Sequence, residues 1–568
     1  MNTGSVFNSL DWIVICLFLL GMVVVVWASM RKKAKSGEDY FLSGRNAGWL
    51  QIGTSIFSSN IGSEHLVGLA GAGFATGMAM AHWEMHGWII LVLGWVFVPI
   101  YDRIKVFTMP EYLEKRFSPG SRSILSILTI ASLVLTKIAA TLYAADVVFR
   151  VLLGRDSLMI MGHQVDIFWV IALGLAIATG IYTALGGLRV IMYTAVLQTP
   201  VLLFGSICIL FIGLGKLGAG DLFAGWHAMI TTVGDNIHLV RPISDKAWAW
   251  PAVLPGSAMI GFWYWCTDQY IVQRVLAGKN QKESRRGSLL AGYLKLTPVF
   301  IFMVPGMVAF ALTKMAGSGF TTSGDAAYTS LVAQILPHGI RGIVACGMLT
   351  ALMASLASKF NASATLFTMD FYQKWHPKAS GMTQVVVGRI ATGVIVLVGI
   401  LWIPVMKTLG KNLYEYLQSV QGYMSPAIAV LFIAGIFWKR ATAPAAFWSF
   451  LIGAFGGIFR LGLDLVIGRP LNDGLATAEA LQAKYGVLFG LQQIHWLYYA
   501  EGLFIVTVLL MVVISLLTKA PAPEKMQFTA YGANTEEKKA TRASWNKWDV
   551  IHTAVVLGVI VAFYVCFW

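Results

Sequence analysis

The feature that most constrains the fold of this chain is a polar interruption inside a long apolar segment. Residues 49–77 are apolar enough to lie in a bilayer, yet they contain the run SSNIGSEH at residues 58–65. Polar and ionisable groups at membrane depth are costly, so they mark a cavity, an ion path or a binding site. The glycines in and after this run suit a helix that breaks there, because unpaired backbone persists in a membrane only in a cavity or against protein. A discontinuous helix at mid-membrane points to the substrate and ion site of a secondary transporter.

The composition places the rest of the chain in the membrane as well. The 568 residues are 57% hydrophobic and 12% charged, with a mean hydropathy of +0.70, whereas soluble domains carry about 25% charged residues. We therefore expect a polytopic, all-α membrane protein that forms one transmembrane domain over residues 1–568. Fourteen apolar spans are predicted, starting near residues 10, 47, 79, 122, 165, 188, 249, 286, 338, 386, 412, 443, 491 and 549.

The formal charge of +15 follows the predicted topology. With the N-terminus outside, the loops that face inward hold 27 of the 42 Lys and Arg residues, and the outside segments hold 11. The remaining four, Lys137, Lys295, Lys359 and Arg460, fall within spans. This asymmetry is the positive-inside rule, so the basic excess indicates topology and contact with anionic lipid rather than nucleic acid. It predicts a multi-pass protein of the plasma (inner) membrane with both termini extracytoplasmic.

A second polar interruption indicates internal symmetry. Five spans after the first, the segment 260–269 reads IGFWYWCTDQ and breaks another apolar helix. Two interrupted helices in corresponding halves are typical of an inverted repeat with the site between the halves. The predicted organisation is an extra N-terminal helix (8–35), a first repeat (45–216), a second repeat (245–440) and three C-terminal helices (443–568) with a flexible linker (519–547). The first helix is expected to be retained rather than cleaved as a signal peptide, since a basic stop follows it.

At these residues the chain resembles the sodium/solute symporter family, in particular its sodium/sugar (glucose/galactose) cotransporter branch. The motifs that carry the resemblance run from EDYFLSGRNAGW to IFWKR and include SSNIGSEHLVGLAGAG, MPEYLEKRF, WYWCTDQYIVQR, YLKLTPVF, LASKFNASATLFTMDFY and YLQSVQGYMSP. The resemblance implies a LeuT-type five-plus-five fold and coupled uptake of a small polar solute.

The resemblance also implies a sugar site. Its members are Asn60 and His65 on the first broken helix, Glu84, Gly261, Tyr264, Trp265, Lys295 and Gln418, with Tyr414 and Tyr264 as the outer and inner gates. Carboxylate, ammonium, carboxamide and imidazole groups suit a ring of hydroxyls, each of which is both donor and acceptor. One carboxylate with one ammonium leaves the site near neutral, which favours a neutral ligand over an anion. Gly261 stands where many members of the family have a hydroxyl or amide side chain.

The resemblance places a sodium site at Ser58, Ile61, Ala351 and Ser355. Backbone carbonyls and a hydroxyl form the all-oxygen shell that a hard cation prefers. Two positions depart from the family: Ala354 replaces a second serine, and Ala195 replaces an aspartate used by some members for a second sodium. One sodium per sugar is therefore the expected stoichiometry.

The predicted function is sodium-coupled import of a neutral hexose by alternating access, with sodium as the coupling ion. The same residues suit myo-inositol or another polyol, and Ala195 and Ala354 keep open a proton-coupled or uncoupled transporter or a sugar sensor. The five cysteines show no disulfide or zinc spacing, and the chain has no nucleophile elbow or phosphate loop, so an enzyme is not expected. The expected partners are a small neutral sugar or polyol and the lipid bilayer, but no nucleic acid, and we expect the monomer to be functional.

Overall fold

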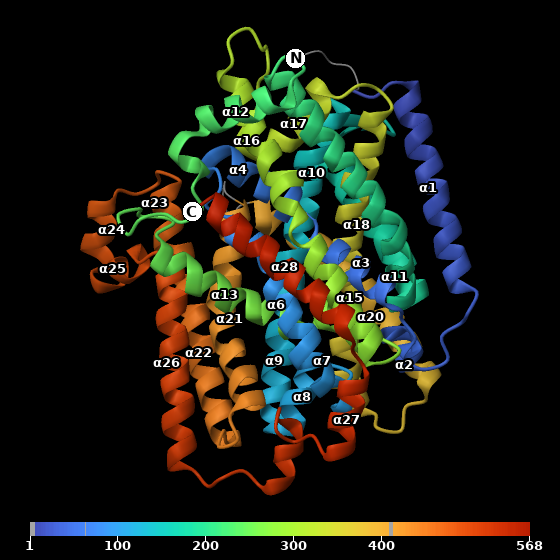
Figure 1. The fold of residues 1–568 in the computed structure, drawn as a ribbon, viewed down its shortest axis with the longest axis vertical. Coiled ribbons are helices and arrows are strands. Elements are labelled where there is room, and N and C mark those ends of the chain that lie inside the picture. The colour runs from blue at the N-terminus through green and yellow to red at the C-terminus, as the bar shows by residue number, and fades with distance from the viewer. Residues whose placement is uncertain (1–5, 63, 408–412) are drawn as a thin grey trace.

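The chain forms a bundle of membrane-length helices (Figure 1). The computed structural model describes residues 6–62, 64–407 and 413–568, without the side chains of residues 403–407 and 413–416. Within the described residues, 11 helical stretches are long and apolar enough to cross a membrane. The count of fourteen spans stays a prediction, because α11 (Ile167–Leu217) runs through two expected spans and the two interrupted segments fall outside the 11.

The helices follow one another in the order that the predicted repeats require. One helix, α1 (Ser9–Met30), comes first. The first predicted repeat contains α3 (Trp49–Asn60), η2 (Glu64–Leu69), α4 (Ala70–Thr76), α5 (Ala81–Glu84), α6 (Gly87–Val92), η3 (Leu93–Phe97), α7 (Val98–Ile104), α9 (Pro119–Ser132), η4 (Leu133–Ile138), α10 (Ala139–Leu153) and α11. The second contains α13 (Trp250–Cys266), α14 (Gln269–Leu276), α15 (Gln281–Leu294), η6 (Val299–Met303), α16 (Val304–Lys314), α18 (Ile340–Leu366), η8 (Phe367–Tyr372), α19 (Gln373–Trp375), α20 (Gly381–Lys407) and α21 (Leu413–Phe437).

Three long helices and several short elements complete the chain. The long helices are α22 (Ala443–Leu463), α26 (Trp496–Leu517) and α28 (Lys547–Cys566). The connections carry α2 (Gly37–Phe41), α8 (Met109–Arg116), a hairpin of β1 (Ser157–Ile160) and β2 (His163–Asp166), α12 (Leu222–Val233), α17 (Ala327–Ile335), η9 (Asp464–Gly468), α23 (Arg469–Asn472), α24 (Ala478–Tyr485), α25 (Val487–Gln493), η10 (Pro523–Phe528) and α27 (Thr535–Ala543). Three short 3-10 helices also lie in the described connections, η1 (Ser43–Arg45), η5 (Gly234–Ile237) and η7 (Gly324–Ala326).

Both interrupted helices break where the sequence predicts. The helix α3 ends at Asn60, Ile61 takes an extended conformation (φ −74°, ψ 123°), and the chain resumes in the π-helix η2. The helix α13 ends at Cys266, and Asp268 is extended (φ −73°, ψ 127°) before α14 begins. Asp268 caps α14 by accepting a hydrogen bond from the backbone N–H of Tyr270 (3.4 Å), which satisfies one of the free donors at a helix start.

Glycines permit two close approaches that shape the bundle. At Gly187 the backbone of α11 turns through φ 58°, and a Cβ there would lie 2.4 Å from the carbonyl oxygen of Tyr40, so the chain bends at this residue. A Cβ on Gly306 of α16 would lie 2.0 Å from the carbonyl oxygen of Ala70 in α4. Small residues let membrane helices approach to backbone contact, so the outer half of the first broken helix is held tightly against α16.

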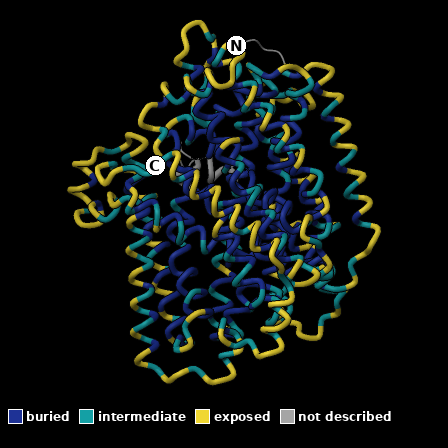
Figure 2. The backbone as a smooth tube through the Cα atoms, viewed as in Figure 1, coloured by how far each residue is buried: buried dark blue, intermediate teal, exposed yellow. Residues whose placement is uncertain are grey.

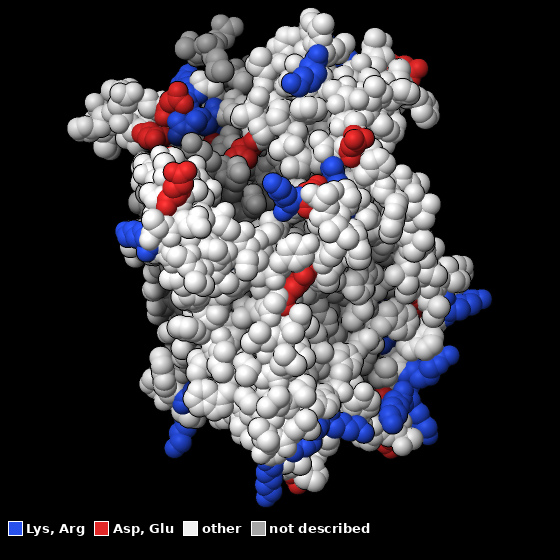
Figure 3. All heavy atoms as spheres, turned by 90° about the vertical axis from the view of Figure 1, so that its left-hand side faces the viewer, with Lys and Arg blue, Asp and Glu red and all other residues white. Residues whose placement is uncertain are grey.

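The surface is arranged as a membrane requires. Figure 2 shows the buried residues gathered along the middle of the bundle, with exposed residues along α1 and the outer faces of other helices. Figure 3 shows a largely uncharged belt, with Lys and Arg gathered toward the lower end. The loops predicted to face inward carry α2, α8 and α27 at the lower end of Figure 1, whereas α12 and α17 lie at the upper end. An apolar belt between polar ends is the expected surface of a protein in a bilayer.

Residues 519–547, predicted to be a flexible linker, contain η10 and α27. Their segment 525–531, here called the strap, lies across the lower end and bonds to several helices. Arg103 Nη2 donates to the carbonyl oxygens of Gln527 (3.0 Å) and Thr529 (2.6 Å), and the Tyr112 hydroxyl donates to the carbonyl oxygen of Phe528 (3.0 Å). The backbone N–H of Ala530 donates to the carbonyl oxygen of Ile436 (2.9 Å). The strap thus ties the ends of α7, α8 and α21 together, which composition alone did not reveal.

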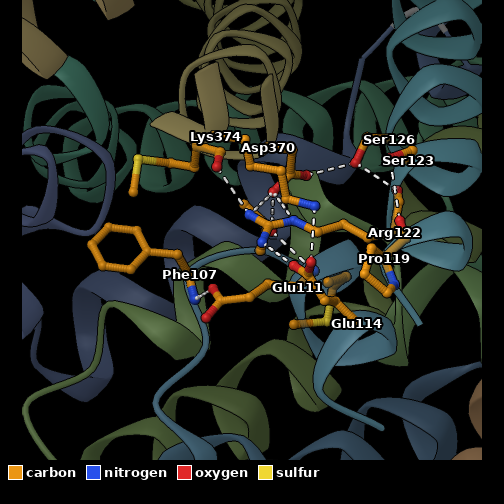
Figure 4. A network of polar contacts seen from close by, with 12 residues as sticks. Phe107, Glu111, Glu114, Pro119, Arg122, Ser123, Ser126, Asp370 and Lys374 are labelled. Atoms are coloured by element: carbon orange, nitrogen blue, oxygen red, sulfur yellow. Dashed lines mark hydrogen bonds and ion pairs between the residues drawn. The ribbon is translucent and has the colours of Figure 1, made fainter. Parts of the chain in front are cut away.

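A polar network next to the strap joins α8, α9 and η8 (Figure 4). Asp370 is buried and accepts hydrogen bonds from Arg122 Nη2 (2.6 Å) and Ser126 Oγ (2.7 Å). Glu114 on α8 pairs with Arg122 and with Lys374 Nζ (3.0 Å). A buried carboxylate is stable only when its oxygens are bonded, so this network fixes the short connection α8 to the ends of two long helices.

Candidate functional site

A central cavity lies between the two broken helices. Its free volume is about 30 Å³, so the lining side chains largely fill it. Its walls come from the end of α3 and η2, from α5 and the residues that follow it, from α13, from the end of α15 and from α21. The lining residues are Asn60, Glu64, His65, Trp83, Glu84, His86, Ile260, Gly261, Tyr264, Trp265, Lys295, Gln418 and Gln421. All eight residues that the sequence assigns to substrate binding therefore line one cavity.

A buried ion pair forms the polar centre of the cavity. Lys295 Nζ lies 2.5 Å from Glu84 Oε2, and the two side chains are 4% and 2% exposed. His65 Nε2 lies 3.5 Å from the same carboxylate oxygen. Lys295 Nζ also donates to Asn60 Oδ1 (3.3 Å). Paired in this way the charges offset each other, while the free lone pairs of the carboxylate and the amide can still accept bonds from hydroxyl groups.

Aromatic side chains form the wall of the cavity on the α13 side. Asn60 Nδ2 donates to the Tyr264 hydroxyl (2.8 Å), and the hydroxyls of Tyr264 and Tyr270 are hydrogen-bonded to each other. The Trp265 ring lies 4.8 Å from that of Tyr264, and Lys295 Nζ lies 5.4 Å from the Trp265 ring centroid. The end of one broken helix is therefore bonded to the end of the other directly beside the ion pair.

The structure does not describe the side chain of Tyr414, the predicted outer gate. Its role as that gate therefore stays a prediction. Gln418, one turn later on α21, lines the cavity and is buried.

The residues assigned to sodium meet where α3 packs against α18. A Cβ on Gly62, in the break, would lie 2.8 Å from Ser355 Oγ and 3.9 Å from the carbonyl oxygen of Ala351. The described backbone hydrogen bonds across the break include none to the carbonyl oxygens of Ser58 or Ile61. Carbonyl oxygens released by a helix break, facing a serine hydroxyl, are the donor set that suits a hard monovalent cation, so the residues fit sodium.

The neighbourhood of this site contains a buried lysine, Lys359, one of the four basic residues that fall within predicted spans. Lys359 is 2% exposed and donates to Thr141 Oγ1 (2.8 Å) and to the carbonyl oxygen of Lys137 (3.3 Å). It lies one helical turn beyond Ser355 on α18. Among the described residues no carboxylate lies within 4.0 Å of its ammonium group. Ala354, where the family has a serine, is buried beside Ser355.

A second buried ion pair supports the inner end of the cavity. Lys137 Nζ donates to Asp268 Oδ2 (2.9 Å), and both side chains are 2% exposed. The ammonium group lies between 4.7 and 5.3 Å from the ring centroids of Trp263, Tyr264 and Tyr270. Asp268 thus joins the break in α13 to η4.

Sequence reasoning missed several cavity residues. They are Trp83, His86, Ile260 and Gln421, and Glu64 was noted only as a titratable group. Trp83 and His86 flank Glu84 in the run AHWEMHGW, so their closeness to a predicted binding residue was the available signal. The structure also answers the question posed by Gly261, because a Cβ there would lie 2.6 Å from the ring of His86. The histidine occupies this space, so the wall is reshaped rather than widened.

Comparison with known proteins agrees with this geometry. Residues 40–453 match the family model described as "Sodium:solute symporter family". The chain is 35% identical to "Sodium/glucose cotransporter 4" of Danio rerio over 93% of this chain and 81% of that protein, and 35% identical to "Sodium/myo-inositol cotransporter 2" of Homo sapiens over 94% and 80%.

A solved structure described as the substrate-bound outward-open state of a Na+-coupled sialic acid symporter aligns with a TM-score of 0.72. It is 19% identical and covers 90% of this chain and 99% of that one. This likeness shows the fold, which is the LeuT type. The chain therefore belongs to the sodium:solute symporter family, and it is a multi-pass membrane transporter that uses sodium as its coupling ion and not an enzyme.

Proposed function

We propose that this symporter imports a neutral hexose similar to glucose or galactose. The observation that carries the proposal is the cavity in which the Lys295–Glu84 pair, Asn60, His65 and the aromatic wall of Tyr264 and Trp265 converge. The ion pair leaves the cavity near neutral and offers both donors and acceptors, which suits a ring of hydroxyls. The aromatic faces cover the C–H surface of a sugar and exclude water.

One sodium ion accompanies each sugar in the proposed cycle. Sodium binds at Ser58, Ile61, Ala351 and Ser355 from outside and holds the first broken helix in an outward-open shape. Sugar then enters, Tyr414 closes above it and Tyr264 below, and the bundle rocks to release both solutes inside. The membrane potential contributes about 2.3 kcal/mol per charge per 100 mV, which drives accumulation of a neutral sugar. Ala195, buried in α11, offers no carboxylate for a second sodium.

The proposed placement has the basic loops in the cytoplasm and both termini outside the plasma (inner) membrane. The separation of α2, α8 and α27 from α12 and α17 supports this orientation, because basic loops stay on the cytoplasmic side. The proposed core consists of two inverted repeats (45–216 and 245–440). The monomer is the proposed functional unit, since a single chain supplies every described wall of the cavity.

The test is uptake of radiolabelled D-glucose, D-galactose and myo-inositol into proteoliposomes under an inward sodium gradient, with an equal choline gradient as the control. Hexose accumulation that requires sodium is expected. Lys295→Ala and Glu84→Ala should each abolish it, since each removes a group that bonds the sugar. The amount of folded protein is measured for both, because each also leaves a buried charge without its partner. Normal uptake by either variant would refute the site assignment.

The second candidate substrate is myo-inositol, because relatives that share 35–36% identity with this chain are sodium/myo-inositol cotransporters. A cyclohexane ring of hydroxyls presents the same donors and acceptors to Glu84, Lys295 and Asn60. Uptake of myo-inositol but not of the hexoses would establish this substrate and refute the first. Sugar-evoked current without accumulation would instead indicate a sensor.

A further inference from the structure

The imidazole of His86 occupies a wall of the cavity that no assigned substrate residue fills. It follows Glu84 by two residues and stands at the N-cap position of α6, without a side-chain capping bond. It is 3% exposed and lines the cavity together with Glu84, Lys295 and Gly261. Its position is therefore set by the same short turn between α5 and α6 that carries the carboxylate of the ion pair.

One nitrogen of this ring has no partner. His86 Nε2 is fully buried and makes no hydrogen bond to any residue that the structure describes. A buried polar atom without a partner costs about 1–3 kcal/mol, so such atoms are rare and call for an explanation. The other histidine of the same run differs, because His82 places both ring nitrogens within hydrogen-bond distance of partners, the Tyr564 hydroxyl (2.8 Å) and the carbonyl oxygen of Leu239 (2.9 Å).

Gly261 makes room for the imidazole. A Cβ at this position would lie 2.6 Å from Cε1 and from Nδ1 of His86, and 2.6 Å from Cδ1 of Ile89. Real Cβ atoms do not approach other atoms so closely, hence any side chain at position 261 would displace the ring. A side chain from α13 and the His86 ring are alternative occupants of the same part of the cavity wall.

We propose that His86 is a substrate-binding and specificity-determining residue whose Nε2 bonds a hydroxyl of the transported sugar or polyol. The inference rests on the proposed function, since it takes the central cavity as the substrate site. A neutral imidazole offers one N–H donor and one acceptor nitrogen, and a hydroxyl satisfies either one. The polar group on this wall thus comes from the turn before α6, and Gly261 is small because the histidine needs the space.

The first test changes the polarity of the ring while keeping its volume. His86→Phe fills the same space without a hydrogen-bonding atom, so the KM for sodium-driven uptake should rise about tenfold for substrates that present the bonded hydroxyl. Uptake of D-glucose, D-galactose, myo-inositol and the monodeoxyglucoses is compared. The deoxy sugar that lacks the bonded hydroxyl should show the same KM in the wild type and in His86→Phe.

The second test moves the polar group to the other helix. Gly261→Ser should raise the KM in the presence of His86 because its Cβ overlaps the ring, whereas in the double variant His86→Ala/Gly261→Ser the serine enters the vacated space and recovers part of the affinity. His82→Asn is the control for a structural histidine of the same run, and it should lower the amount of folded protein without changing the ratio of KM values among substrates.

The two proposals fail in different ways. If Lys295→Ala abolishes uptake but His86→Phe leaves every KM and the ranking of substrates unchanged, the role of His86 is refuted and the sugar site stands. The role of His86 is also refuted if the double variant is no better than His86→Ala. If the wild type accumulates none of the sugars or myo-inositol, the proposed function is refuted and the inference falls with it.

Discussion

Replacing Lys359 by Met should strengthen sodium binding. The substitution keeps the length of the side chain but removes a positive charge that is 2% exposed and has no carboxylate within 4.0 Å among the described residues. The ammonium group lies beyond Ser355 on the same helix and donates to Thr141 and to the backbone of Lys137. A buried cation beside a cation site lowers its affinity by repulsion, so its removal should have the opposite effect.

The magnitude follows from the helix geometry. Four residues on α18 place Lys359 about 6 Å along the axis from Ser355. Because the side chain reaches toward Thr141 on α10, we take a separation of roughly 10 Å, which gives a repulsion of about 1.7 kcal/mol at an effective dielectric constant of about 20. That energy corresponds to about a 15-fold change in the sodium dissociation constant. Glu64 interacts electrostatically with Lys359 and offsets part of the repulsion, so a decrease of about five- to 15-fold is expected.

The assay is the initial rate of substrate uptake into proteoliposomes as external sodium is varied, with choline as the replacement cation. The half-saturating sodium concentration is compared for the wild type, Lys359→Met and Lys279→Met, whose lysine is exposed. The last variant should match the wild type. An unchanged or higher half-saturating concentration in correctly folded Lys359→Met would refute the electrostatic reasoning.

Three further predictions concern the broken helices and the strap. Lys137→Ala should lower the free energy of unfolding by about 3–5 kcal/mol because it leaves the buried carboxylate of Asp268 uncompensated. The double variant Lys137→Met/Asp268→Leu should recover most of that free energy, as measured by thermal denaturation. No recovery would argue against the stabilising role of the pair. Gly62→Ala places a methyl group 2.8 Å from Ser355 Oγ, so sodium should no longer stimulate uptake or protect against heat, and retained stimulation would contradict the site. Tyr112→Phe removes one bond to the strap and should speed tryptic cleavage at Lys525, with unchanged cleavage as the contrary result.

The broken helices were predicted from local signals in the sequence, and eight of the residues that line the cavity were predicted from the resemblance to the family. Polar residues inside an apolar run mark a break, and charged residues such as Glu84 and Lys295 at membrane depth have few alternatives to a buried site. The pairing of Lys137 with Asp268 joins residues 131 positions apart. Such a contact depends on how distant helices pack, so no periodicity along the chain reveals it.

The other features that the sequence did not predict also depend on how distant segments of the chain pack. Composition predicted a flexible linker over residues 519–547 but did not predict its bonds. These join backbone carbonyls to Arg103 and Tyr112, and backbone carbonyls carry no sequence signal. The sequence also did not reveal that the His86 ring occupies the space beside Gly261, because a glycine shows only that a side chain is absent. What fills its space depends on the neighbouring helix.

The strap gives this transporter a mechanical link outside the membrane. It is bonded to Arg103 and Tyr112 in the first predicted repeat and to Ile436 in the second. A conformational change that moves the two repeats apart at this end must therefore break or distort those hydrogen bonds. Part of the activation barrier for a conformational step that separates the repeats at this end is thus expected to lie in the strap, where substitutions should change the turnover rate but leave the affinity for solute and ion intact.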